Sequence, residues 1–486
     1  MSMAIYDNIH RYMVRVICEQ PLHIGSSDGD KEDILRHPTT GHPFVQASGI
    51  AGVLADYVQK AHGEEMRERL FGVAKKRDKK VRDENKRGVK ANEKINSDVI
   101  DERSKVVVLD GRFVLDTVKL EMRTRCSLNG ATGSVNAKQV LGNEVVSGQL
   151  TTAEYIGTGA EFDFVVLVYG NEKEDDYKIV EDAFAAMNAG KIRFGGQNTT
   201  GFGRVSISEI RVNFYDMTDK SQREKWAELT DMYMPDGEIK TDYIKNLVEK
   251  LKDKDYCITF KAVLNTALLI KANMIDEERI AKSLGRIEKM PDFMNIINAK
   301  KEYIIPGTSL KGIFRSRIET IGEYLALPQE QIAEVFEQRS KILFEDAVIQ
   351  KERSFEKKRI HLNKISGSTK YKALFSECVT GGEAEVTIHV DAARLEESSE
   401  AVLTPKACVA LLLYVIRDLA VGAVSLGSGA SIGRGLINVD SVSIQKGSEK
   451  KAEFSMEEKQ AVKDSFVAEC LKELERISFA ENSGEA

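Results

Sequence analysis

The chain of 486 residues carries one series of sequence blocks twice. VQASGIAGVLADYV, which begins at Val45, matches IPGTSLKGIFRSRI, which begins at Ile305, without a gap. Three more pairs follow in the same order: RCSLNGATGS with RIHLNKISGS, EVVSG with ECVTG, and FGGQNTTGFGRV with LGSGASIGRGLI. A weaker pair, PLHIG and ALLIK, precedes them. Chance similarity does not preserve order over five blocks, so the sequence predicts two copies of one domain.

Hydrophobic periodicity predicts the same elements in both copies. In the first copy we expect strands at 12–18, 105–115, 162–169 and 204–212 and helices at 50–61 and 177–188. In the second we expect strands at 256–264, 384–390 and 436–444 and helices at 310–325 and 405–421. The order β-α-β-β-α-β predicts an α+β fold of two tandem ferredoxin-like (RRM-like) domains, each an antiparallel sheet with both helices on one face.

The predicted boundaries leave three segments outside the repeat. Domain 1 covers 1–215, a helical linker covers 216–254, domain 2 covers 255–445, and a C-terminal amphipathic helix and tail cover 446–486. Ser455 and Glu458 form a capping box for that helix, which is expected over 455–477. The insertion at 72–104 is rich in Lys and Arg, which fits either a solvated segment or a phosphate-binding flap.

Composition excludes several classes of protein. The longest apolar run, 407–416, is shorter than the ~20 residues that a membrane-spanning helix needs, and the N-terminus lacks the order of a signal peptide. The six cysteines are scattered and form no C-x-x-C pair, so we expect a cytoplasmic protein without disulfides or a structural zinc site. The net charge of −6 is compatible with a local basic groove.

Two glycine-rich loops and one helix start are the candidate anion-binding features. Each loop precedes a strand, whereas a mononucleotide-binding loop precedes a helix. The glycines are therefore better suited to let the protein backbone come close to the phosphates of a polynucleotide. Pro306 and Gly307 can start a helix whose N–H groups bind an anion, with Lys311 and Arg315 on its first turns. The first copy has alanine at the positions of Gly307, Lys311 and Arg315, so the copies cannot bind a polyanion equally well.

These motifs resemble the RAMP superfamily, and in particular the backbone subunits of type III CRISPR effector complexes. The resemblance covers most of the chain in two copies, as in a fused double backbone subunit. It implies a guide-RNA groove, partner subunits of the complex, a target RNA, and β-hairpin thumbs, which we place at 129–144 and 363–377. The candidate RNA contacts are Ser48, Gly52, Arg193, Gly195, Gly196, Gly201, Gly203, Arg204, Gly307, Thr308, Ser309, Lys311, Gly312, Arg315, Arg359, Gly427, Gly429, Gly433 and Arg434.

The resemblance also implies cleavage of target RNA by its own 2′-OH, assisted by an aspartate and by Mg²⁺ or another divalent cation. The residue at the family spacing is Asp292 in the second copy, and Asp30 or Asp33 in the first, with Asp28 less favoured. His23 and His37 are nearby candidates for a general base. Two alternatives remain open, a non-catalytic RNA-binding scaffold of the same complex and an endonuclease that processes precursor guide RNA.

Overall fold

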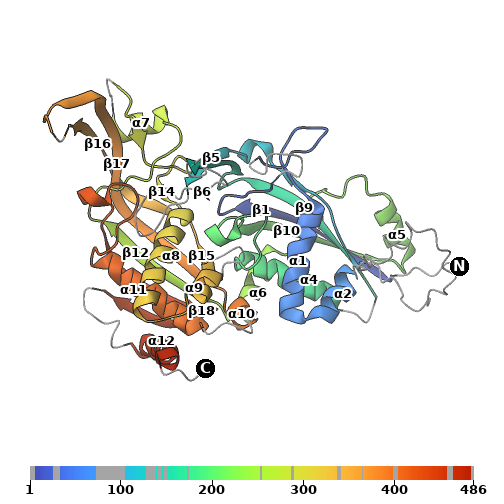
Figure 1. Cartoon of the computed structure of the whole chain (residues 1–486). Coiled ribbons are helices and arrows are strands. Elements are labelled where there is room, and N and C mark those ends of the chain that lie inside the picture. The colour runs from blue at the N-terminus through green and yellow to red at the C-terminus, as the bar shows by residue number, and fades with distance from the viewer. Residues whose placement is uncertain are drawn as a thin grey trace, which may run out of the picture.

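The computed structural model describes residues 6–25, 33–72, 104–126, 138–139, 145–146, 150–171, 175–251, 254–285, 289–336, 341–363, 365–397, 403–456 and 464–482. Two units, here called unit 1 (residues 6–251) and unit 2 (residues 254–482), lie side by side, each built on one large sheet (Figure 1). No helix among the described residues is long and apolar enough to cross a membrane. Each unit combines helices with a mainly antiparallel sheet, so the predicted α+β class is confirmed.

Unit 1 is built around a central strand, β1 (Asn8–Cys18), which pairs antiparallel with β9 and β10. The other strands are β2 (Phe44–Val45), β3 (Val106–Val108), β4 (Gly111–Phe113), β5 (Leu120–Cys126), β6 (Lys138–Gln139), β7 (Val145–Val146), β8 (Leu150–Ile156), β9 (Glu161–Gly170), β10 (Val205–Asp216) and β11 (Glu238–Ile239). The helices are α1 (Ala47–His62), α2 (Glu64–Phe71), α4 (Asp176–Asn188), η3 (Asn198–Thr200), α5 (Lys220–Ala227) and α6 (Thr241–Leu247).

Unit 2 repeats this plan around β12 (Tyr256–Leu264), which pairs antiparallel with β17 and β18. Its other strands are β13 (Phe293–Met294), β14 (Ile304–Ile305), β15 (Ile342–Phe344), β16 (Ala347–Leu362), β17 (Thr369–Val390), β18 (Ile437–Lys446) and β19 (Glu449–Ser455). Its helices are α7 (Glu277–Leu284), α8 (Gly307–Tyr324), α9 (Gln329–Phe336), α10 (Ala392–Glu397), α11 (Pro405–Ala420), η5 (Ala430–Ile432) and α12 (Ser465–Asn482).

The two large sheets share one strand order. In unit 1 the order β10-β1-β9 continues to β3 and β4, and in unit 2 the order β18-β12-β17 continues to β15 and β16. Pairing is antiparallel except for the short strand β13, which runs parallel to β17. The single strand predicted at 105–115 is split into β3 and β4. Asp110, which lies between them, accepts a hydrogen bond through its carboxylate from the Ala47 N–H at the start of α1.

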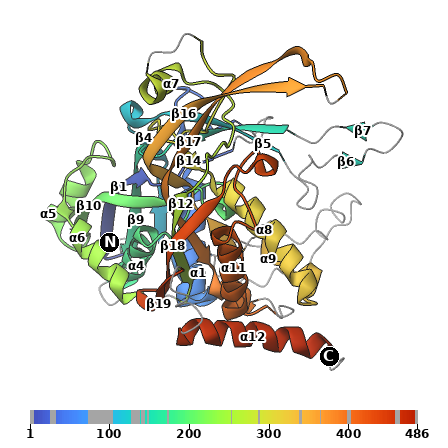
Figure 2. The same cartoon turned by 90° about the vertical axis from the view of Figure 1, so that its left-hand side faces the viewer.

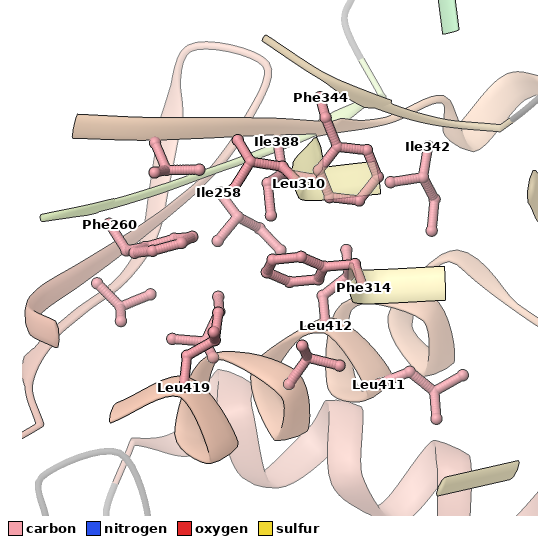
Figure 3. Packing of buried hydrophobic residues seen from close by; sticks show 14 of the residues in the cluster. Ile258, Phe260, Leu310, Phe314, Ile342, Phe344, Ile388, Leu411, Leu412 and Leu419 are labelled. Carbon is pink, nitrogen blue, oxygen red and sulfur yellow. The ribbon is translucent and has the colours of Figure 1, made fainter. Parts of the chain in front are cut away.

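The core of unit 2 lies between the sheet and the helices α8 and α11 (Figure 3). Alternate residues of β12, such as Ile258 and Phe260, point to this face and are fully buried. Phe314 of α8 and Leu412 of α11 meet them from the helix side. Each buried side chain of this size contributes roughly 1.5–3 kcal/mol of hydrophobic free energy.

The segment expected to be a linker packs onto unit 1. Arg11 of β1 is fully buried beneath it and donates hydrogen bonds to the carbonyls of Met232 and Met234. Trp226 packs on the face of the sheet opposite α1 and α4, and α6 packs on α4. The segment thus covers both layers of unit 1, so it is a part of that fold.

The C-terminal helix occupies the equivalent place in unit 2. It packs on α11 through Phe466, Cys470 and Leu474, beneath the body of the unit in Figure 2. The predicted capping box is wrong, because Ser455 is the last residue of β19 and the helix α12 begins at Ser465. Both units therefore end with an edge strand followed by a helix. These are β11 and α6 in unit 1, and β19 and α12 in unit 2.

Candidate nucleic-acid interface

The start of α8 lies at the junction between the units. A Cβ atom at Gly307 would lie 2.2 Å from the carbonyl oxygen of Phe344 and 2.6 Å from that of Thr200 in unit 1, so only glycine fits. The Gly307 N–H donates to a carboxylate oxygen of Asp346 at 2.8 Å. Asp346 thus satisfies one of the free N–H groups of the helix start, which the sequence analysis left open for an external anion. Thr308 and Ser309, the next residues, are half-buried.

Lys311, on the first turns of α8, is half-buried and has no ion-pair partner among the described residues. Its burial, with a smaller contribution from the positive charge of Arg315, lowers the pKa of the Lys311 ammonium to about 8. Arg315 itself is paired with Glu319 at 2.8 Å, one helical turn further on. A half-buried ammonium without a carboxylate partner is suited to an incoming phosphate.

The affinity for single-stranded RNA is therefore expected to fall as the pH rises from about 7 to about 9. In that interval Lys311, whose pKa is about 8, loses the charge that attracts phosphate. A Lys311→Arg variant keeps its charge throughout, so its affinity should stay constant. Fluorescence anisotropy with labelled RNA at several pH values measures both curves, and a parallel decline in the two would remove Lys311 from the interface.

The corresponding helix start in unit 1 carries no such charge. Ala47 replaces Gly307, and its N–H donates to Asp110 at 2.6 Å as Gly307 donates to Asp346. Ala51 and Ala55 occupy the positions of Lys311 and Arg315. The capping carboxylate is thus duplicated, while the cationic surface is specific to unit 2.

Several loop glycines are required by close approach to the chain's own backbone. A Cβ atom at Gly195 would lie 2.1 Å from the carbonyl oxygen of His23, and one at Gly201 would lie 2.3 Å from that of Phe344. A Cβ atom at Gly203 would lie 2.0 Å from the carbonyl oxygen of Phe194, and one at Gly427 would lie 2.7 Å from that of Leu269. All four have a positive φ angle. Internal packing is thus sufficient to require glycine at these four positions, and their contact with phosphate stays a prediction.

Other predicted glycines face open space. A Cβ atom at Gly52, Gly312 or Gly433 would meet nothing within 4 Å, and at Gly196 nothing closer than 3.7 Å. Gly429 differs from these, because its φ angle is +91° and a Cβ atom would lie 2.9 Å from the Arg434 Cδ atom, and both favour glycine. These positions remain candidates for contact with an RNA backbone, as does the exposed residue Ser48 at the start of α1.

Two of the predicted arginine contacts are buried in ion pairs. Arg193 lies 2.7 Å from a carboxylate oxygen of Glu345, and Arg434 lies 2.5 Å from one of Glu377. All four side chains are at most 7% exposed. Neither guanidinium can reach a phosphate without breaking its pair, which weakens the case for these two RNA contacts, and the contacts stay predictions.

Glu345 is the centre of a junction cluster formed by Glu345, Arg193, Arg204 and His389. Arg204 pairs with the same carboxylate at 2.9 Å, and the His389 Nε2 atom lies 3.0 Å from it. These partners hold the pKa of Glu345 well below its usual range despite burial. Although burial opposes the shift, hydrogen bonds with Cys257 and Glu345 raise the pKa of His389 to about 9. Both arginines come from unit 1, so the cluster fastens the two units together.

A second chain of contacts crosses the junction beside this cluster. Asp346 accepts a hydrogen bond from Arg123 of β5 at 2.6 Å, and Arg123 pairs with Glu121 at 2.7 Å. Glu121 in turn accepts from the Ala299 N–H of unit 2 at 2.6 Å. The start of α8 is therefore held by side chains of both units.

Asp292 lies in a cleft of about 550 Å³, the Asp292 cleft, bordered by the outer half of the β16–β17 hairpin and by the loop that precedes η5. Asp292 is exposed, and one of its carboxylate oxygens accepts from the Ser376 N–H at 2.7 Å, which fixes the side chain. Arg359 is 38% exposed and lies 3.7 Å from Glu377 on the cleft wall. The structure thus brings two predicted residues, Asp292 and Arg359, together.

The predicted residues of the first copy are less closely gathered. Asp33 is exposed, whereas Asp30 and Asp28 lie outside the described residues. His23 is buried, with its Nδ1 atom 2.9 Å from the Glu154 carbonyl oxygen, and the ring of His37 packs edge-on against Phe44. His23 therefore has a packing role here, which does not suit a general base.

The donor set at Asp292 limits how a divalent cation could bind. No group of three His, Cys, Asp or Glu residues that could hold a metal ion occurs among the described residues. Glu377 is committed to Arg434, and Asp292 has one carboxylate oxygen left. Mg²⁺ retains several waters and is often bound by one or two carboxylates together with substrate phosphates, so a single oxygen suffices only if RNA supplies the rest.

The predicted thumb of unit 2 is a long hairpin. β16 and β17 pair from Ile349 with Ala384 out to Leu362 with Thr369, and the hairpin projects away from the sheet beside α7 (Figures 1 and 2). Its surface mixes cations such as Lys358 with exposed apolar residues such as Ile360. The corresponding region of unit 1, 129–144, and the basic insertion lie largely outside the described residues.

Comparison with known families decides which group the chain is part of. The sequence model of the RAMP superfamily matches residues 15–206 and 229–438. The chain belongs to the RAMP superfamily. The first region lies within unit 1, and the second begins in the last part of unit 1 and covers most of unit 2.

Comparisons with individual proteins are less informative. No curated protein sequence matches this RAMP chain. A chain in the cryo-EM structure of the Type III-B Cmr-beta bound to cognate target RNA is similar at 15% identity, with a TM-score of 0.30. The similarity covers 42% of this chain and 61% of that one.

The two RAMP regions differ in one buried pair. Leu22 pairs with Ile156 in unit 1, and Leu268 pairs with Thr380 at the equivalent place in unit 2, so Ile156 corresponds to Thr380. Three residues earlier in the same strands, Ala153 therefore corresponds to Glu377. The pairing of the EVVSG and ECVTG blocks, which aligned Glu144 with Glu377, is therefore wrong. Beside Ala153 lies Phe202, at the position of Arg434. An apolar pair in unit 1 thus stands where unit 2 has an ion pair.

Sequence reasoning missed Glu345 and Asp346, which organise the junction, and Lys271, Phe293 and Phe375, which line the Asp292 cleft. Glu345 and Asp346 follow β15, and Asp110 follows the corresponding strand β3 of unit 1. An acid two residues after this strand in both copies could therefore have pointed to Asp346. No periodicity marks Glu345 or the cleft residues, because their partners come from distant parts of the chain.

Proposed function

We propose that this RAMP protein binds guide RNA as a double backbone subunit of a type III CRISPR effector complex. The observation that supports it best is the start of α8. Lys311, which has no ion-pair partner among the described residues, lies on this helix, and the first residue of the helix, Gly307, packs against the Thr200 carbonyl of unit 1. A single strand of RNA across this junction meets both units. Gly312 lies one residue beyond Lys311 and leaves open space for the sugar-phosphate backbone.

The finer description of the fold belongs to the same proposal. The order β10-β1-β9-β3, with α1 between β1 and β3 and α4 between β9 and β10, is the β-α-β-β-α-β order of a ferredoxin-like domain. Unit 2 has the same order. Each unit is then an elaborated ferredoxin-like domain with an added edge strand and terminal helix.

Target RNA is the substrate in this proposal, and the neighbouring effector subunits complete the binding surface. Asp292 orients the 2′-OH of the target strand and accepts its proton through the carboxylate oxygen that Ser376 leaves free. The 2′-oxygen then bonds to the adjacent phosphorus while the bond from phosphorus to the 5′-oxygen breaks, and the departing 5′-oxygen takes a proton from water. Arg359, exposed beside it, holds a phosphate of the strand. A divalent cation bound between Asp292 and the RNA would stabilise the charge that develops on the phosphate.

A non-catalytic scaffold is the second candidate function. The observation that favours it is the donor set, which offers one carboxylate oxygen and no cluster of acids among the described residues. Cutting of a guide-complementary RNA by the assembled complex, with Mg²⁺ present and with it chelated, separates the two functions.

RNA binding itself is tested by the salt dependence of affinity. Lys311→Ala should weaken binding of the full chain to single-stranded RNA and reduce the slope of log affinity against log salt by about 0.7 for the lost phosphate contact. Lys220, 83% exposed on α5, is the matched control, and Lys220→Ala should leave the slope unchanged. An unchanged slope in a folded Lys311→Ala variant would contradict the proposed interface.

A further inference from the structure

Unit 1 carries a counterpart of the surface on which unit 2 receives it. Asp346 and Asp110 lie two residues after the strands β15 and β3, and each accepts a hydrogen bond from the first N–H of a helix, that of α8 or α1. Asp346 and Asp110 are therefore equivalent, and so are the residues before them, Glu345 and Leu109. Glu345 is the centre of the junction cluster, whereas unit 1 has an apolar residue at the same place.

The neighbouring strand shows the same exchange. Val166 of β9 pairs with the last residue of β3, and Ile388 of β17 pairs with the last residue of β15. The residues that follow, Leu167 and His389, are therefore equivalent, and His389 belongs to the junction cluster. A polar docking surface in unit 2 thus corresponds to an apolar surface in unit 1, here called the leucine surface, formed by Leu109 and Leu167.

Residues 217–236, here called the strap, cover the leucine surface. Leu109 and Leu167 pack in one cluster with Trp226 and Tyr233 of the strap. The helix α5, which carries Trp226, lies at the end of unit 1 that is away from unit 2 (Figure 1). The strap therefore occupies on unit 1 the position that unit 1 occupies on unit 2.

Two polar contacts fix the strap near its C-terminal end. Arg11 of β1, fully buried beneath the strap, forms an ion pair with Asp236. The Tyr233 hydroxyl donates to the Asp110 carbonyl oxygen at 2.6 Å, beside the leucine surface. Because a buried cation is costly without its counter-charge, the ion pair holds the strap in one position on unit 1.

The other half of such a contact is exposed on unit 2. Unit 1 docks on unit 2 through its glycine-rich loop, in which Thr200 lies against α8 and Arg204 joins the junction cluster. The equivalent loop of unit 2, 427–436, has Ile432 at the position of Thr200 and Leu436 at that of Arg204. Ile432 is 50% exposed. Apolar residues thus replace polar ones on both sides of the contact, so the loop of unit 2 matches the leucine surface in character.

A contact between two different surfaces does not close on itself, so its repetition from chain to chain produces an open filament. We propose that the strap prevents this, because it occupies a docking surface of unit 1 that would otherwise receive loop 427–436 from a second copy of the chain. Unit 1 is thereby closed, while unit 2 keeps its exposed loop. The inference concerns the chain alone and does not require RNA.

Light scattering of the full chain over a range of concentrations tests the inference. Wild type should stay monomeric, whereas in Trp226→Ala/Tyr233→Ala the average mass should at least double between ~1 and ~100 µM, as for a micromolar dissociation constant. Asp236→Asn should act in the same direction, because it releases the strap from Arg11 and leaves the apolar cluster unchanged. Hydrogen exchange should show a faster strap, with β1 and β9 still protected, which establishes that the variants are folded.

A second substitution on unit 2 identifies the partner surface. Ile432→Asp, added to either released variant, should restore the monomer, because it places a charge against the leucine surface of the next chain. Tyr324→Asp is the control, since Tyr324 is 85% exposed on α8, and it should leave the association as it is. Association that persists with Ile432→Asp or stops at a dimer would show that the uncovered leucine surfaces meet each other, and would overturn the inference. Released variants that stay monomeric, or a wild-type chain that polymerises with its strap protected, would overturn it as well.

Discussion

Glu345→Gln is expected to lower the free energy of unfolding by about 3–5 kcal/mol, because it leaves buried cations without their counter-charge. Glu345 is 7% exposed and faces Arg193, Arg204 and His389. Glutamine keeps the size of the side chain, so the effect isolates the charge. Chemical denaturation of the full chain measures it, and the transition that involves the contact between the units should shift most.

The control is Asp440→Asn, since Asp440 is 43% exposed and pairs with Lys261 at 3.5 Å. A solvent-exposed pair of this kind contributes at most about 1 kcal/mol. Equal effects of the two substitutions would show that the junction cluster does not hold the units together.

The junction cluster also predicts how stability depends on pH. The folded pKa of His389, about 9, is raised above the ordinary 6.5. Its contribution is therefore fully present below that ordinary value and is lost as the pH rises through about 9. Glu345→Gln removes the carboxylate partner of His389 but leaves its hydrogen bond with Cys257, so a part of this dependence should disappear from the denaturation midpoints of the variant.

Hydrophobic alternation was enough to predict the central parts of the fold. β12 has the predicted bounds, because alternate residues from Tyr256 to Leu264 are buried. The helix α11 begins at the predicted Pro405, the favoured residue for a first helical turn. Elements at the edges were missed: β16 carries cations such as Lys351 and Arg353 on an exposed hairpin, so no alternating apolar pattern marks it.

The candidate site could be predicted only in part. Lys311 and Arg193 are equally plausible phosphate contacts in the sequence, and only the fold shows that Glu345, 152 residues away, neutralises Arg193. Gly201 and Gly312 are likewise indistinguishable in the sequence. In the structure the carbonyl of Phe344 lies against Gly201, whereas Gly312 faces open space. Contacts between units decide these roles, and they are not encoded in local spacing.

Asp292→Asn is expected to remove one product of target-RNA cleavage by the assembled complex, with a loss in rate of about 10²- to 10⁴-fold at that position. Asparagine retains an oxygen that can accept the hydrogen bond from the Ser376 N–H, now 2.7 Å long, so the loop should keep its conformation. It can neither carry the charge that attracts a divalent cation nor accept a proton. Gel analysis of the labelled target measures the products.

Affinity for RNA should be nearly unchanged in Asp292→Asn, because the proposed phosphate contacts at Lys311 and Arg359 are intact. Asp33→Asn or Asp30→Asn should erase a different product, since each unit meets a different phosphodiester. Asp440→Asn, an exposed acid on β18, serves as the matched control and should leave the pattern as it is. If all of these variants give the wild-type products, catalysis resides in another subunit and the chain is the scaffold on which guide and target are displayed.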